Sequence, residues 1–103
     1  MTRLEQIKAL IADDPHDAML RFALGNEHFQ LEQYAEAIEA LKGAIEIDPE
    51  YAFVYIQLAE AYEKSGRTAL ARQTVEAGRA PAVRNGDPNL MRQLDDIAAR
   101  LPA

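Results

Sequence analysis

Apolar residues recur along the chain at the spacing of amphipathic α-helices. In the first such segment, roughly residues 17–31, four side chains fall on one helical face at i, i+4, i+8 and i+11: Leu20, Leu24, His28 and Leu31. Similar stripes predict helices over residues 34–47, 51–65 and 68–84. No alternating run of β-branched residues indicates a strand. The pattern therefore predicts an all-α protein.

The chain also matches itself when it is shifted by 34 residues. The step Asp14-Pro15 falls on Asp48-Pro49, and small and apolar positions remain in phase, among them the pairs Ala18/Ala52, Leu24/Leu58, Gly25/Ala59 and Ala37/Ala71. Because a proline just past a helix blocks its continuation, the shared Asp-Pro step marks a helix end in each period. A period of this length is typical of proteins built from stacked helix pairs.

Two glycines lie inside predicted helices, Gly25 and Gly78. Glycine within a helix costs up to about 1 kcal/mol relative to alanine. A close crossing of two helices is a packing reason for this cost. We therefore predict that neighbouring helices approach one another tightly at both positions.

Residues 18–51 resemble a tetratricopeptide repeat in its characteristic positions, which are here Leu24-Gly25, Tyr34, Ala37, Leu41, Ala44 and Pro49. Residues 52–85 resemble a second, weaker repeat with Val83 in place of the terminal proline, and residues 3–14 resemble the second half of a preceding repeat. The first repeat departs from the family at Arg21, where Trp or Tyr is usual. The resemblance implies a right-handed superhelical stack of antiparallel helix pairs, about six helices in one domain of residues 1–103.

A final helix is predicted over residues 88–101. Gly86 ends the preceding helix, Asp87 is a suitable N-cap, and Pro88 suits the first helical position. An apolar stripe follows at i, i+4, i+7 and i+11: Leu90, Leu94, Ile97 and Leu101. We expect this segment to cap the stack, and we expect Pro81 to kink the preceding helix or to end it near Ala80.

The resemblance further implies that the first helix of each repeat lines a concave groove. The residues placed there are Met19, Phe22, Asn26, Phe29 and Gln30 in the first repeat, and Phe53, Ile56, Gln57, Glu60, Glu63 and Lys64 in the second. All three phenylalanines are among them, so the groove is expected to have an apolar floor and an acidic edge. Such a groove would bind a peptide or an amphipathic helix of another protein. Alternatively, some of these aromatic side chains pack against the neighbouring repeat or the chain's own termini.

One subclass of the family grips a C-terminal carboxylate with lysine and asparagine side chains. Asn26 occupies one matching position, but Phe22 stands at the lysine position, and Glu60 stands where the second repeat would need a donor. A buried carboxylate requires donors and positive charge. The carboxylate-gripping function is therefore not expected here.

The net charge of −6 disfavours a nucleic-acid partner, because that affinity rests mainly on Lys and Arg. The charge is uneven: residues 1–66 hold 13 acids and 5 bases, and residues 67–103 hold 4 acids and 6 bases. This asymmetry and the unpaired half repeat indicate an alternative function, a self-associating homodimer or assembly subunit. The exposed side of residues 3–12 is its expected seam.

The remaining composition argues against catalysis and against a membrane protein. There are no cysteines, no apolar run of membrane-spanning length and no apolar stretch typical of a signal peptide, so a cytoplasmic protein is expected. His28 and Glu32 have metal-pair spacing but no third ligand, and we predict a core histidine there and an exposed one at His16. No phosphate-binding glycine loop or other catalytic motif is found. We expect no catalytic residues, no metal and no cofactor.

Overall fold

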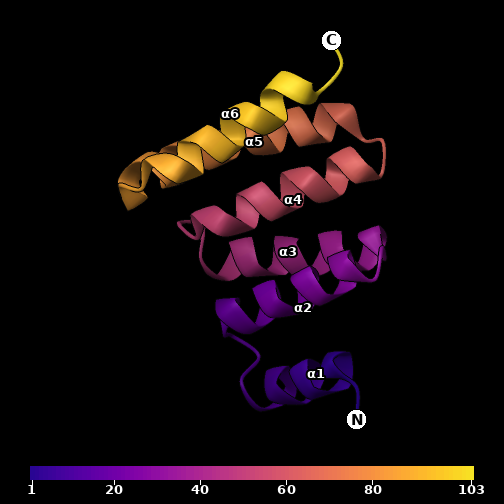
Figure 1. Cartoon of the computed structure of the whole chain (residues 1–103). Coiled ribbons are helices and arrows are strands. Elements are labelled where there is room, and N and C mark those ends of the chain that lie inside the picture. The colour runs from indigo at the N-terminus through magenta and orange to yellow at the C-terminus, as the bar shows by residue number, and fades with distance from the viewer.

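The computed structural model describes all 103 residues and contains six α-helices joined by short turns (Figure 1). They are α1 (Arg3–Asp13), α2 (Ala18–Gln30), α3 (Tyr34–Ile47), α4 (Ala52–Lys64), α5 (Thr68–Asn85) and α6 (Pro88–Arg100). The all-α prediction is confirmed, and the ends of each helix differ from the predicted ones by at most one residue. The 34-residue pattern thus predicts both the number of helices and their positions in the sequence.

The helices form two layers that follow one another up the stack (Figure 1). In the inner layer, α4 contacts α2 on one side and α6 on the other. In the outer layer, α1, α3 and α5 do not contact one another and pack only on the inner helices. Because the inner helices lie closer together than the outer ones, the face made by α2, α4 and α6 is the concave side of the stack.

The turns inside the two helix pairs have the same backbone. The Gln33 N–H donates to the His28 carbonyl at 2.9 Å, and the Arg67 N–H donates to the Tyr62 carbonyl at 2.8 Å. The residue before each donor has a positive φ, 59° at Glu32 and 77° at Gly66. Glycine adopts this left-handed conformation without steric cost, whereas a side chain such as that of Glu32 strains it.

Replacing Glu32 by glycine is therefore expected to raise the free energy of unfolding, by up to about 1 kcal/mol. The gain is partial because glycine also has more freedom in the unfolded chain. Urea denaturation followed by circular dichroism measures it. The matched control is Glu39→Gly, at an exposed site inside α3. It should lower the free energy of unfolding by about 1 kcal/mol. Equal losses at both positions would contradict the account of the turn.

The ends of the last two helices agree with most of the predictions. Gly86 has a φ of 85° and ends α5, the Asp87 carboxylate accepts a hydrogen bond from the Asn89 N–H at 2.9 Å, and α6 begins at Pro88. Of the two alternatives predicted at Pro81, a kink or an early end near Ala80, the early end is wrong, because α5 continues through Pro81 to Asn85. α3 stops before the Asp48-Pro49 step, whereas α5 has Val83 at the position that corresponds to Pro49.

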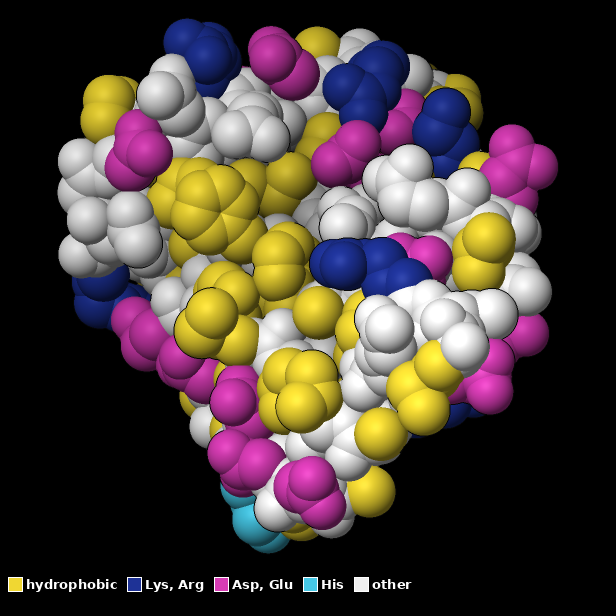
Figure 2. Space-filling model, turned by 60° about the horizontal axis from the view of Figure 1, so that its bottom comes forward, with side chains coloured by type: hydrophobic (Ala, Val, Ile, Leu, Met, Phe, Trp, Pro, Cys, Tyr) yellow, Lys and Arg dark blue, Asp and Glu magenta, His cyan; other side chains and the backbone are white.

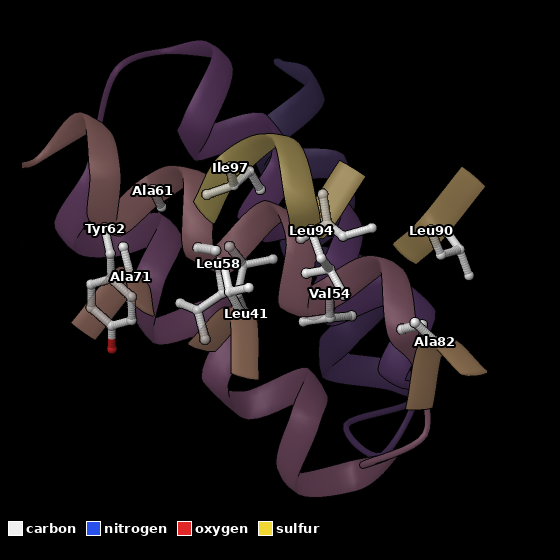
Figure 3. Packing of buried hydrophobic residues seen from close by; sticks show 14 of the residues in the cluster. Leu41, Val54, Leu58, Ala61, Tyr62, Ala71, Ala82, Leu90, Leu94 and Ile97 are labelled. Atoms are coloured by element: carbon white, nitrogen blue, oxygen red, sulfur yellow. The ribbon is translucent and has the colours of Figure 1, made fainter. Parts of the chain in front are cut away.

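A core of buried side chains runs through the repeats and is closed by α6 (Figure 3). Leu90 and Leu94 are fully buried beneath that helix, as the capping prediction requires. The predicted close crossings are also confirmed. A Cβ added at Gly25 would lie 2.6 Å from the Leu41 Cδ2, and one added at Gly78 would lie 2.7 Å from the Tyr55 Cβ.

Candidate functional site

Two of the predicted groove residues are large apolar side chains open to solvent. Met19 on α2 is 69% exposed and Phe53 on α4 is 46% exposed. They are 34 residues apart, so they occupy the same position of successive repeats. Both helices belong to the inner layer. These two side chains therefore provide accessible apolar surface at equivalent positions of the inner helices.

The other two phenylalanines are partly used by the fold. The ring of Phe22 lies 5.3 Å from that of Tyr51, which precedes α4, and the ring of Phe29 lies 5.4 Å from that of Tyr34, which begins α3. Both phenylalanines are half-buried against the core. Much of the surface of these two rings is therefore packed against the chain itself, as the alternative interpretation of the aromatic side chains proposes.

Ile56 lies inside the core, with only 4% of its surface exposed. It offers almost no area to a partner, because α6 packs on that face of α4. Between the two helices is a small cavity of about 90 Å³, lined by Ile56, Glu60, Gln93, Asp96, Ile97 and Arg100. The sequence prediction omitted the α6 side of this cavity. The signal was the spacing of Gln93, Asp96 and Arg100, which places three polar side chains on one face of the last helix.

The remaining predicted residues frame these apolar positions with polar groups. Asn26 on α2 and Gln57 on α4 are half-buried, whereas Gln30 and Lys64 are exposed at the ends of the two helices. Figure 2 shows a face of the molecule on which hydrophobic side chains gather in a patch beside acidic and basic ones. The inner layer thus combines apolar, amide and charged groups, a mixture suited to a polypeptide ligand.

Two glutamates on α4 differ in their electrostatic surroundings. Both carboxylate oxygens of Glu63 accept hydrogen bonds from Arg100, each at 2.8 Å, and this pairing lowers the pKa of Glu63. Glu60, one turn earlier, has no ion pair. Its pKa is raised, mainly because partial burial disfavours the charged form, although Arg100 opposes the shift.

Glu60→Gln is expected to raise the melting temperature at pH 7. The corresponding gain in the free energy of unfolding should be below about 1 kcal/mol. A group whose pKa is raised on folding stabilises the protein fully only below its unfolded pKa, about 4.3. That contribution is lost as the pH rises through the folded pKa, so the gain from glutamine should vanish towards pH 4. Glu63→Gln is the control: its lowered pKa predicts a loss at pH 7 that shrinks as the pH falls through the folded pKa. Parallel effects of both variants across the pH range would contradict this assignment.

The outer layer also carries an apolar cavity, which the sequence prediction missed. It has a volume of about 360 Å³ between α3 and α5, and its apolar lining includes Ile45, Tyr55, Leu58, Tyr62, Leu70 and Ala77. The corresponding cavity of the first repeat is lined by three charged residues, Arg21, Glu36 and Glu39, and by three apolar ones, Leu24, Ala35 and Ala40. The sequence feature that could have indicated the apolar cavity is Leu70, a leucine at the position where the first repeat has Glu36. This cavity is the competing site for an apolar ligand.

The two histidines lie where the sequence predicted. His28 is buried, and its Nδ1 lies 2.8 Å from the Gln33 Oε1, whereas His16 is exposed in the turn before α2. No group of three or more His, Cys, Asp or Glu side chains has an arrangement that could hold a metal ion. None of the six helices has both the length and the apolar character required to cross a bilayer.

Paired helices in two layers, with a concave inner face, define a helical repeat protein of the kind that presents an extended surface. Residues 25–66 match the family described as TPR repeat. The whole chain is similar to the TPR repeat-containing protein PA0015 of Pseudomonas aeruginosa, with 31% identity over 95% of this chain and 93% of that protein. The chain belongs to the tetratricopeptide-repeat family.

Solved structures agree with this assignment. Protein BPP2914 from Bordetella parapertussis has a TM-score of 0.84 and 31% identity, covering 98% of this chain and 88% of that one. The TPR2B domain of yeast Sti1, solved in complex with pHsp70, has a TM-score of 0.77 and 26% identity, covering 90% and 80% of the two chains. The predicted family and fold are therefore confirmed.

Proposed function

We propose that the chain is a protein-interaction module that binds a peptide or an amphipathic helix of a partner protein on its concave face. The observation that carries the proposal is the exposure of Met19 and Phe53 at the same position of successive repeats. Large apolar side chains on a concave surface are suitable anchors for a polypeptide ligand. The proposal includes a cytoplasmic location and no catalytic activity.

The comparisons support an interaction module in general terms. The TPR2B domain of Sti1 is similar in fold, and its structure is that of a complex with pHsp70. The present chain has Phe22 and Glu60 at two groove positions where binding of a carboxylate would require donors. The proposal therefore takes from this relative only a polypeptide ligand, and it leaves out recognition of a terminal carboxylate.

The test begins with random peptides of about twelve residues, selected by display on the purified protein. Fluorescence polarisation then measures their affinity for the protein and its variants. Met19→Ser combined with Phe53→Ser is expected to weaken binding at least about tenfold, because each anchor loses its buried apolar contact. The control is Leu70→Ser, which removes an exposed leucine from the outer layer.

A change below about twofold is expected for this control. If the Leu70 variant loses the peptides and the double variant retains them, the ligand occupies the outer cavity and the proposal is wrong. A failure to select any peptide would equally contradict it. Circular dichroism of each variant confirms that the helices are retained.

Self-association is a second candidate, and one feature of α1 favours it. Leu10 is 53% exposed, whereas Ala44, its equivalent in α3, is fully buried against the paired helix. α1 contacts only α2 and therefore has an uncovered apolar position. Multi-angle light scattering over a concentration series separates the two functions: a dimer would support self-association, and a constant monomer mass would remove it.

A further inference from the structure

The charge of the inner face differs between its two repeats at one equivalent position. Asn26 on α2 and Glu60 on α4 are 34 residues apart, and both are half-buried. The fold therefore accommodates a neutral amide at this position of the first repeat. A carboxylate is present only in the second repeat, where α6 packs beside it.

This carboxylate is costly in the unbound protein. Partial burial raises the pKa of Glu60, which means that the surroundings disfavour its charged form. No cation lies within ion-pair distance of it. Since Asn26 shows that a neutral side chain fits the same place, packing does not account for the charge at Glu60. A ligand that brings a positive charge would account for it.

Neither of the neighbouring cations forms an ion pair with Glu60. Arg100 also lines the cavity between α4 and α6, but both of its hydrogen bonds go to Glu63, and Lys64 is exposed at the end of α4. Asp96, on α6, has no ion pair and lines the same cavity as Glu60. The cavity, about 90 Å³, is larger than the space that one water molecule needs. It can therefore admit the tip of a lysine or arginine side chain.

We propose that the partner segment carries a lysine or arginine that enters the cavity between α4 and α6 and pairs with Glu60 and Asp96. Its apolar side chains contact Phe53 and Met19. This inference rests on the proposed function, because it specifies the chemistry of the segment bound on the same inner face. It favours a basic, apolar polypeptide over an acidic one.

The spacing of the two contacts sets the register of the ligand. Phe53 and Glu60 are seven residues apart on α4, which corresponds to about 10 Å along the helix axis. An extended peptide covers that distance in about three residues, and a helical one in about two turns. The basic residue should therefore follow or precede the apolar anchor at one of these two separations.

The experiment compares peptides selected by display on the wild-type protein with those selected on the Glu60→Gln, Asp96→Asn variant. Peptides from the wild type are expected to be enriched in lysine and arginine at a fixed distance from an apolar residue, and the variant should lose this enrichment. The control is Glu36→Gln with Glu39→Gln, which removes the same charge from the outer layer. It should leave the enrichment unchanged.

Affinities of one selected peptide provide the second readout. At low salt the Glu60→Gln, Asp96→Asn variant should bind this peptide at least about fivefold more weakly than the wild type does. Replacing the basic residue of the peptide by methionine should abolish the difference between the two proteins. No basic enrichment, or an equal loss with the control variant, overturns the inference. If the serine variants at Met19 and Phe53 lose the peptides while the charge variants do not, the proposed function stands and this inference fails. If neither set changes binding, both fail.

Discussion

Replacing Leu94 by alanine is expected to lower the free energy of unfolding by about 3 kcal/mol. Leu94 is fully buried and projects from α6 into the core, where a Cβ on Gly78 would come within 3.5 Å of it (Figure 3). Loss of its side chain removes apolar area and leaves a cavity at the last layer of the stack.

Urea denaturation measures the effect, with Met91→Ala as the control on the same helix. Met91 is only half-buried, so its truncation should cost about 1 kcal/mol. A loss below about 1 kcal/mol at Leu94, or an equal loss at both positions, would show that α6 does not seal the core. The capping role assigned to this helix would then be wrong.

Gly78→Ala is expected to destabilise the protein by about 2 kcal/mol, although alanine favours helices. The new Cβ would lie 2.7 Å from the Cβ of Tyr55, an atom fixed to the backbone of α4. Relief therefore requires the two helices to separate. A displacement of the Tyr55 side chain would also disturb the hydrogen bond that its hydroxyl donates to the Pro49 carbonyl at 2.8 Å.

Two other glycines provide graded controls for this prediction. At Gly43 the nearest atom to an added Cβ is the Arg21 Cδ at 3.8 Å, so Gly43→Ala should stabilise the protein by up to about 1 kcal/mol. At Gly25 the clash is with the side chain of Leu41, which can shift more readily than a backbone-bound atom, so a smaller loss is expected than at Gly78. Thermal unfolding of the three variants tests this order, and a stabilising Gly78→Ala would refute the close crossing.

Much of this fold follows from local physical rules in the sequence. The Asp48-Pro49 step ends α3, Gly86 ends α5, and the period of apolar positions gives every helix. The close crossing at Gly78 was also predictable, since glycine in a helix interior needs a packing reason. The helix ends and positions depend on a few residues and their immediate neighbours along the chain, and for that reason the sequence alone is enough to infer them.

The inner surface was less predictable, because the accessibility of a side chain depends on helices distant in sequence. Ile56 has the helical position of a groove residue, yet α6 covers it. Phe22 lies on the expected face, but Tyr51 packs on its ring. A helical projection gives the direction of a side chain and not the neighbour that it meets. The apolar cavity around Leu70 was missed because it requires α3, α4 and α5 together.

The most direct test of the account is an NMR titration of the ¹⁵N-labelled protein with a peptide selected on it. Amide shifts are predicted to change around Met19, Phe53 and Glu60 on α2 and α4, and along the adjoining face of α6. Little change is expected around Leu70 on the outer layer or Leu10 on α1. Shifts concentrated in either of those two regions, with the inner helices unchanged, would contradict the claim that the concave face binds the partner.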